Sequence, residues 1–209
     1  MNSDSQFTIL TMRAEKQNTA TRRRQIALAA MGIIARQGLK ELNLSAVARE
    51  VGLVPSALYR HFKGKEEILQ ATLTLIRELI LENLRIVTRE SPSPLEQLRL
   101  LMRRHLTMIQ EFQAIPRIVF SDEISVPEAG GKKAVYKIIR GLLGQVSLLV
   151  ARGQQMGQVK PDLDPDTVSV IYLGFIQPPA ILWYLSQGNF NIDRHMKKAW
   201  PVFEEAVKL

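Results

Sequence analysis

A short stretch in the first third of the chain combines side chains suited to contact a polyanion. Ser56 and Tyr59 are about one helical turn apart, and Lys65 follows them closely. Hydroxyl groups can hydrogen-bond to base edges or phosphate oxygens, and a lysine ammonium brings positive charge to phosphate. Residues 1–65 contain eleven Lys and Arg against four Asp and Glu, which is +7 of the net charge of +8 in this 209-residue chain. Unless they are only scattered surface charges, these residues indicate a polyanion-binding module.

Patterns typical of catalytic and metal sites are missing from the sequence. The histidines, His61, His105 and His195, are far apart, and none belongs to a His-x-x-x-His ligand motif. No phosphate-cradling Gly loop, nucleophile elbow or Ser-His-Asp pattern is present. The absence of Cys excludes disulfides, thiolate metal sites and a Cys nucleophile, and it fits a reducing compartment. We therefore expect that the protein is not an enzyme and that it binds no metal and no cofactor.

The polyanion-binding residues are predicted to lie on three helices between residues 21 and 65. Gly38 suits the position that ends the first helix, and Asn43 is a favourable N-cap for the second. Gly52 suits a tight turn that requires positive φ, and Pro55 suits the first turn of the third helix. Two short helices joined by such a turn form a helix-turn-helix motif, whose second helix presents side chains to base edges.

The rest of the chain is also predicted to be helical, which gives an all-α fold of about nine helices. Ser91-Pro92-Ser93-Pro94 is the clearest break, and we place the domain boundary near it. Pro178-Pro179 lies inside a helix predicted over 165–186 and should kink it near Ile176. No apolar run approaches the roughly 18–20 residues of a membrane span. The predicted parts are a flexible arm over 1–20, a helix-turn-helix domain over 21–65, a connector helix over 66–91 and a second domain over 92–209.

The segment from Asn43 to Leu69 resembles the DNA-binding domain of the TetR family of bacterial repressors. Its most specific part is Leu58-Tyr59-Arg60-His61-Phe62 followed by Lys63-Gly64-Lys65. The likeness covers about a quarter of the chain, and the remainder agrees in length and helical character. The resemblance implies a DNA-binding transcriptional regulator, a ligand-released repressor that binds a palindromic operator as a homodimer in the cytoplasm. The alternatives are a non-regulatory DNA-binding protein on the same fold, architectural or acting in cell division, and, far behind, an enzyme.

The resemblance also implies roles for individual residues in DNA binding. Taken singly, most of these residues are ordinary surface charges or half-buried aromatics, and an arginine triplet is more often a solvated helix start. In this order, however, they match the family. Arg22, Arg23 and Arg24 would reach the backbone or the minor groove; Ser45, Val54, Pro55, Ser56 and Tyr59 would face the major groove; and Asn43, Tyr59, His61 and Lys65 would hold phosphates.

The second domain is expected to bind a small effector and to form the dimer. Effector binding would favour a conformer in which the connector helix tilts, so that two recognition helices no longer match successive major grooves. An apolar or aromatic effector is expected from the residues suggested for the pocket, which are His105, Met108, Phe112, Arg117, Phe120, Tyr136, Arg140, Tyr172, Gln177 and Trp183.

The dimer is expected to form through the last two helices, predicted over 166–186 and 193–207. Their apolar residues could equally belong to the interior of one subunit, and the sequence does not divide the two groups. The residues concerned are Val168, Ile171, Phe175, Leu182, Leu185, Val202 and Phe203.

Overall fold

The computed structural model describes residues 3–125 and 130–209, and over these residues the fold is all-α, as predicted. The one β-type pairing within the described ranges is an isolated bridge between Val159 and Lys208. The chain divides into two compact units, Met1–Leu75 (unit 1) and Ile76–Leu209 (unit 2). The division falls inside a helix rather than near Ser91–Pro94, because the continuous connector helix supplies residues to both units.

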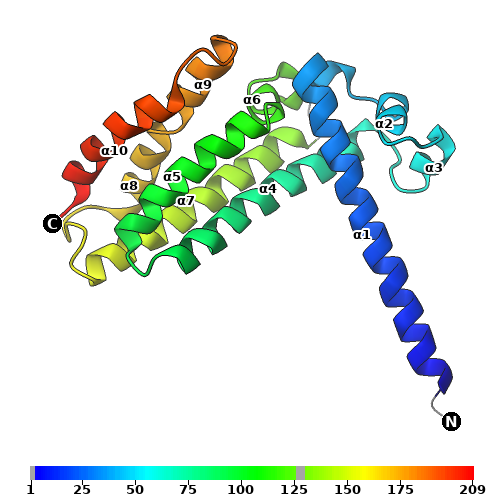
Figure 1. Ribbon diagram of the computed structural model, residues 1–209, viewed down its shortest axis with the longest axis horizontal. Coiled ribbons are helices and arrows are strands. Elements are labelled where there is room, and N and C mark those ends of the chain that lie inside the picture. The colour runs from blue at the N-terminus through cyan, green and yellow to red at the C-terminus, as the bar shows by residue number, and fades with distance from the viewer. Residues whose placement is uncertain (1–2, 126–129) are drawn as a thin grey trace. The chain divides into compact units, whose positions relative to one another are not determined.

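Unit 1 is built on a long first helix and three short elements that pack on it. Its elements are α1 (Ser3–Gln37), η1 (Leu39–Glu41), α2 (Leu44–Glu50), α3 (Pro55–Tyr59) and the first part of α4 (Lys65–Glu90) (Figure 1). Ile34, Val47 and Leu58 are fully buried between them. The expectation that α1 begins at Thr21 is wrong, since the helix begins at Ser3. No Gly or Pro interrupts residues 3–31, so no residue there stops a helix.

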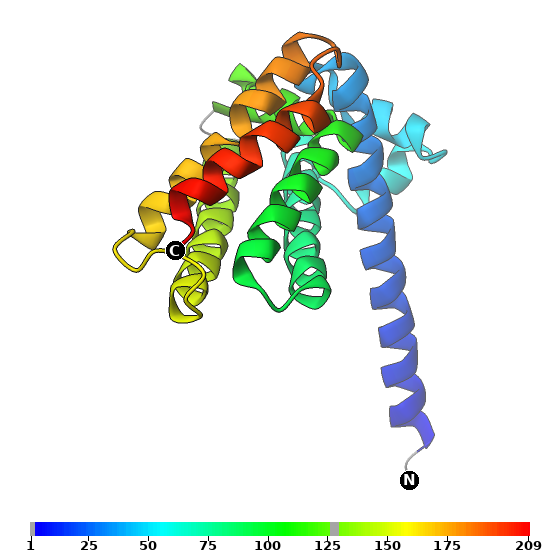
Figure 2. The ribbon, with the colours of Figure 1, turned by 60° about the vertical axis from the view of Figure 1, so that its left-hand side comes forward.

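Unit 2 places α4, α5 and α7 side by side, with the last three helices beside them (Figures 1 and 2). Its elements after α4 are α5 (Pro94–Glu111), α6 (Ala114–Val119), η2 (Asp122–Ser125), α7 (Gly131–Gln155), α8 (Pro165–Gly174), α9 (Gln177–Leu185) and α10 (Ile192–Val207). Leu98, Leu101, Val146 and Phe203 are buried between these helices. A loop was expected over 125–131, and most of it, 126–129, lies outside the described residues.

Side-chain caps fix the starts of several helices, and the sequence predicts them at Asn43, at Asp164 and at either Asn191 or Asp193. The Oδ1 atom of Asn43 accepts a hydrogen bond from Ala46 N at 2.8 Å. Asp164 accepts from Thr167 N at 2.8 Å, with Pro165 at the first helical position. Thr167 Oγ1 also donates to Asp164 Oδ2, at 2.6 Å, and this side-chain hydrogen bond, together with the backbone one, lowers the pKa of Asp164. Asn191 caps α10 in the same way. Each cap satisfies an N–H group that the helix itself leaves free.

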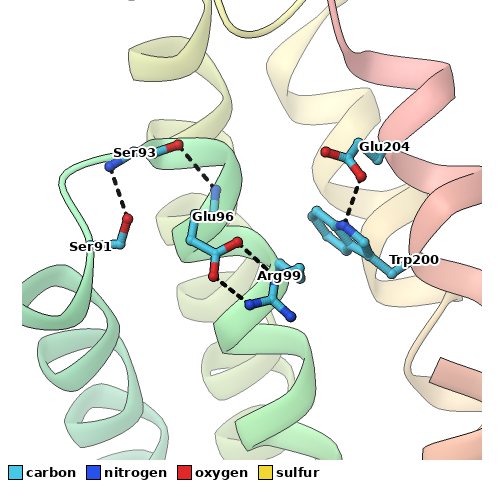
Figure 3. A network of polar contacts seen from close by, with 6 residues as sticks. All are labelled: Ser91, Ser93, Glu96, Arg99, Trp200 and Glu204. Atoms are coloured by element: carbon cyan, nitrogen blue, oxygen red, sulfur yellow. Dashed lines mark hydrogen bonds and ion pairs between the residues drawn. The ribbon is translucent and has the colours of Figure 1, made fainter. Parts of the chain in front are cut away.

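The start of α5 has a polar network of its own (Figure 3). Ser93 Oγ accepts from Glu96 N at 3.3 Å, and Arg99 Nε donates to Glu96 Oε2 at 2.6 Å. This hydrogen bond lowers the pKa of Glu96. Arg99 extends from α5 toward α10, where Trp200 Nε1 donates to Glu204 Oε2 at 3.1 Å. Glu204 also raises the pKa of Arg99, after the larger effect of Glu96. The first turns of α5 are thus linked electrostatically to α10.

Pro178-Pro179 divides the helix that was predicted over 165–186. Helix α8 ends at Gly174 and α9 begins at Gln177, so the break lies at Phe175 and Ile176, where the kink was expected. Proline lacks the N–H group that would bond to the preceding turn, and its ring clashes with that turn. The two prolines occupy the start of α9, where an N–H group would have no helical partner.

Two stretches of unit 2, Gly131–Gln155 and Pro165–Leu185, are long and apolar enough to cross a membrane by length and composition alone. Neither stretch is an uninterrupted apolar run, since charged or polar residues occur in both. Their length and composition are weak evidence for a membrane location, because packed helices of soluble proteins pass the same test. Only 22% and 33% of the residues in these windows are buried, so much apolar surface remains open on them.

Candidate nucleic-acid interface and ligand cavity

The turn between α2 and α3 sets the direction of α3. Gly52 has a φ of 69°, in the left-handed region that favours glycine, as predicted. Leu53 N donates to Ala48 O at 2.8 Å, which closes the turn against α2. Leu58 is fully buried and fixes α3 to the rest of unit 1. The two short helices and their turn therefore form a packed helix-turn-helix motif.

The outer face of this motif presents the residues that were expected to meet base edges. The side chains of Val54 and Tyr59 are 65% and 59% exposed, although both are large and apolar in part. Pro55 and Ser56 are exposed beside them, and Ser45 is exposed in the first turn of α2. These five residues flank the tight turn of a single motif. An exposed face of short, polar and apolar side chains on a short helix suits contact with the major groove.

The predicted phosphate ligands lie around the same motif, and two of them already have partners within the chain. Asn43 uses Oδ1 as the cap of α2 and donates from Nδ2 to Glu41 O at 3.0 Å. Lys65 Nζ, at the start of α4, donates to Lys40 O at 3.1 Å. The His61 side chain is half-buried directly after α3. A phosphate contact by Lys65 would therefore add to, or replace, a hydrogen bond to a neutral carbonyl.

The three neighbouring arginines on α1, residues 22–24, differ in their contacts. Arg23 Nη1 donates to His61 O at 3.1 Å, and its guanidinium carbon lies 4.5 Å from the centre of the Phe62 ring. Arg22 donates to Gln25 one turn further along α1, and Arg24 is exposed. Arg23 thus connects α1 to the segment that follows α3, a role that the sequence reasoning missed. Only the tertiary structure brings residues 23 and 61 together.

The residues suggested for the effector pocket have different surroundings in the structure. His105 and Tyr172 are buried, whereas the side chains of Phe120 and Tyr136 are 51% and 63% exposed. The guanidinium carbon of Arg117 lies 5.8 Å from the centre of the Tyr184 ring. Tyr172 donates to Leu98 O at 2.8 Å and is core, and its burial raises the pKa of its hydroxyl.

His105 is the unusual member of that set. Its burial lowers its pKa to about 4, so the ring is neutral at neutral pH. Its Nδ1 atom is buried without a hydrogen-bond partner among the described residues.

Two of the suggested residues, Met108 and Phe112, do line a cavity, between α4 and α5. It has a volume of about 300 Å³ and is called the α4–α5 groove below. The sequence reasoning missed its other lining residues. The sequence does contain a sign of them, because Arg103, Thr107 and Glu111 follow each other at four-residue intervals on the polar side of α5. A polar helix face of this kind is usually interpreted as exposed to solvent. The remaining lining residues are Leu79, Asn83 and Arg104.

A second apolar concavity lies on α8, α9 and α10, with a volume of about 670 Å³. Ile171, Leu182 and Val202 line it and are 52%, 48% and 63% exposed. With Leu185, which is 69% exposed, they are called the α8–α10 face below. Val168 and Phe203, in contrast, are buried in the interior of unit 2. The structure thus divides the apolar residues that the sequence left undivided.

A helix-turn-helix motif with an exposed recognition helix, on a chain whose positive charge is concentrated around it, defines a DNA-binding protein. Residues 26–72 match the bacterial regulatory proteins of the tetR family, and residues 91–204 match the tetracyclin repressor-like C-terminal domain. The second match alone covers more than half of the chain. The protein belongs to the TetR family and is a DNA-binding transcriptional regulator.

Individual relatives agree with this assignment. The fatty acid metabolism regulator protein of Bacillus subtilis is 23% identical over 171 residues, which are 80% of this chain and 86% of the relative. The nucleoid occlusion factor SlmA of Sodalis glossinidius is 22% identical over 90% of this chain and 96% of its own. The triclosan complex of SmeT, a repressor from Stenotrophomonas maltophilia, shares the fold with a TM-score of 0.75, at 19% identity over 90% of this chain and 91% of SmeT.

Proposed function

We propose that this regulator is a cytoplasmic repressor that binds a palindromic operator as a homodimer and leaves it when a small effector binds. The observation that supports DNA repression most directly is the exposed face of α3, with Val54 and Tyr59 held outward while Leu58 anchors the helix. Exposure of such apolar surface to water is unfavourable, and exposed apolar side chains of this kind are typical of a recognition surface. The family's tetracyclin repressor-like second domain supports an effector site in unit 2.

In this proposal the residues of unit 1 divide into base readers and phosphate ligands. Ser45, Val54, Pro55, Ser56 and Tyr59 face the major groove, with Val54 and Pro55 limited to apolar contacts such as a thymine methyl. Few polar side chains then reach the bases, so DNA shape contributes to specificity. The phosphate ligands are Asn43, Tyr59, His61 and Lys65, with Arg22 and Arg24 alongside.

The homodimer is supported by the α8–α10 face. Ile171, Leu182 and Val202 line an apolar concavity that the single chain leaves open. A second copy of the same face would bury these side chains, and two-fold symmetry would then match the symmetry of a palindrome. The effector acts by population shift, because it can change DNA affinity only by binding one conformer of α4 more tightly than the other.

The test of DNA binding removes one charge from the proposed phosphate clamp. Lys65→Gln should weaken binding to every duplex sequence and reduce the slope of log affinity against log salt by about one. The measurement is fluorescence anisotropy over a series of salt concentrations, with an operator selected from random duplexes. Lys137→Gln, on α7, is the matched control and should leave the slope unchanged. Unchanged affinity of Lys65→Gln at every ionic strength would contradict the proposal.

A non-regulatory role on the same fold is the second candidate, and the similarity to a nucleoid occlusion factor favours it. The two functions differ in the number of sites occupied. A repressor occupies one or a few promoter palindromes, whereas a nucleoid-associated protein occupies dispersed sites. Genome-wide mapping of binding separates them, and dispersed binding that no small molecule alters would exclude the repressor.

A further inference from the structure

The α4–α5 groove contains hydrogen-bond donors with poor partners. Arg104 Nε is buried and has no hydrogen-bond partner among the described residues. Within the described ranges its Nη1 atom donates to Glu90 Oε1, at a long 3.5 Å. Asn83 Nδ2 is directed at the thioether sulfur of Met108 at 3.8 Å, and a thioether is a weak acceptor. A buried donor without an acceptor destabilises the protein, so the groove is suited to a ligand that brings acceptors.

The charges that line the groove favour an anionic acceptor at one end. Arg103 and Arg104 are neighbours on α5, and both line the cavity. Glu111 is the carboxylate among the lining residues, and it lies seven residues further along α5, about 10 Å by helical rise. Two further acids lie near the arginines: the contact of Glu90 with Arg104 is long, and Glu96, which interacts with Arg103, is already paired with Arg99. A carboxylate or phosphate at the arginine end would form charge-assisted hydrogen bonds, which are stronger than those now present.

The remaining surface of the groove is apolar. Leu79 from α4 faces Met108 and Phe112 from α5 across the cavity, on the side away from the arginines along α5. Met108 is 4% exposed, and its flexible side chain can adapt to the shape of a ligand. A cavity of about 300 Å³ is within the range of small-molecule sites.

We propose that the α4–α5 groove binds an amphiphilic anion, with its carboxylate or phosphate on Arg103 and Arg104 and its apolar part on Leu79, Met108 and Phe112. This inference rests on the proposed effector response, for which it names the ligand class and the site. Helix α4 forms one wall of the groove, and its first part, from Lys65 to Leu75, belongs to unit 1. A ligand between α4 and α5 therefore contacts the helix that continues into the DNA-binding motif.

The test measures binding of decanoate to the full-length protein by calorimetry, without DNA, so that failure of DNA binding cannot affect it. Decanoate should bind, and Arg104→Gln should weaken it by at least about tenfold, because a charge-assisted hydrogen bond is lost. Arg152→Gln, an exposed α7 control, should bind like the native chain. Decanol, which has the same chain without charge, should bind at least about tenfold more weakly. Decyl phosphate distinguishes the head groups, since equal binding indicates recognition of either anion and weaker binding indicates a carboxylate site.

A second variant removes the groove without touching its charges. Thr107 is exposed at the rim, so Thr107→Trp should fill the cavity, keep the folded core and prevent decanoate binding. Native affinity in both variants, equal affinity for decanol and decanoate, or no binding of decanoate to the native chain would each overturn the proposal. Decanoate that binds the groove but does not release operator would instead contradict only the effector role.

Discussion

Arg23 illustrates how one side chain can support a DNA-binding surface without touching DNA. Its guanidinium donates to His61 O and stacks on Phe62, both immediately after the recognition helix α3. Phe62 is buried, so the arginine covers one face of a core aromatic ring. A cation–π contact and a hydrogen bond together contribute about 1–2 kcal/mol. Arg23 therefore positions the end of α3 relative to α1.

Replacement of Arg23 separates this positioning role from a phosphate contact. Arg23→Lys keeps the charge but loses the planar stacking, and we expect it to lower the free energy of unfolding by about 1 kcal/mol and to weaken operator binding several-fold. The salt dependence of binding should stay as in the native chain. Thermal unfolding and salt-dependent anisotropy provide the measurements. If Arg23→Lys retains native stability while Arg23→Gln reduces the salt slope by about one, Arg23 is a phosphate ligand instead.

At the scale of elements, the turn between α2 and α3 depends on one backbone conformation. A Cβ atom added at Gly52 would meet no atom within 4 Å, so space does not require glycine there. The backbone conformation is what requires glycine, since an L residue with the φ of 69° found here is strained by about 1–2 kcal/mol. The same substitution within a helix has the opposite sign, because alanine is the better helix former.

Gly52→Ala should lower the free energy of unfolding by about 1–2 kcal/mol and weaken operator binding. Gly141→Ala is the matched control, since Gly141 lies within α7 and an added Cβ there also meets nothing within 4 Å. It should raise stability by about 0.5–1 kcal/mol. Thermal or denaturant unfolding of both variants decides the matter. A gain in stability from Gly52→Ala would show that the turn does not need the left-handed conformation.

At the scale of the whole molecule, the open apolar surface of the single chain lies in part on the α8–α10 face. Leu185 is 69% exposed there, while Phe203, on the same helical hairpin, is 1% exposed and contacts the rings of Tyr172 and Phe175. Helices α8, α9 and α10 thus bury one side within unit 2 and leave the other without a cover. The proposed dimer would cover the side of these helices that unit 2 leaves exposed.

Val202→Asp should convert the dimer to a monomer, because it places a charge in the apolar centre of the proposed interface. The fold should be retained, since Val202 is 63% exposed in the single chain. Operator affinity should fall at least about a hundredfold, because two linked half-site contacts become independent. Leu148→Asp, on α7 and 59% exposed, is the control. Analytical ultracentrifugation gives the oligomeric state, and a Val202→Asp dimer as tight as the native one would exclude this face.

Sequence reasoning was sufficient for the features that depend on a few neighbouring residues. The caps at Asn43, Asp164 and Asn191 and the positive φ of Gly52 follow from hydrogen bonds and backbone preferences within four residues. The break before Pro178 has the same local origin. The DNA-binding motif was accessible to sequence reasoning because it consists mainly of such local features, placed at fixed spacing.

Side chains that are far apart in the sequence are brought together by the packing of the folded chain. The contact of Arg23 with His61, the groove between Asn83 and Arg104, and the separation of buried Phe203 from exposed Val202 all depend on how helices pack. Helical spacing shows that a face is apolar, but it does not show whether the chain's own helices or another surface covers that face. The effector site is therefore much less visible in the sequence than the DNA-binding motif.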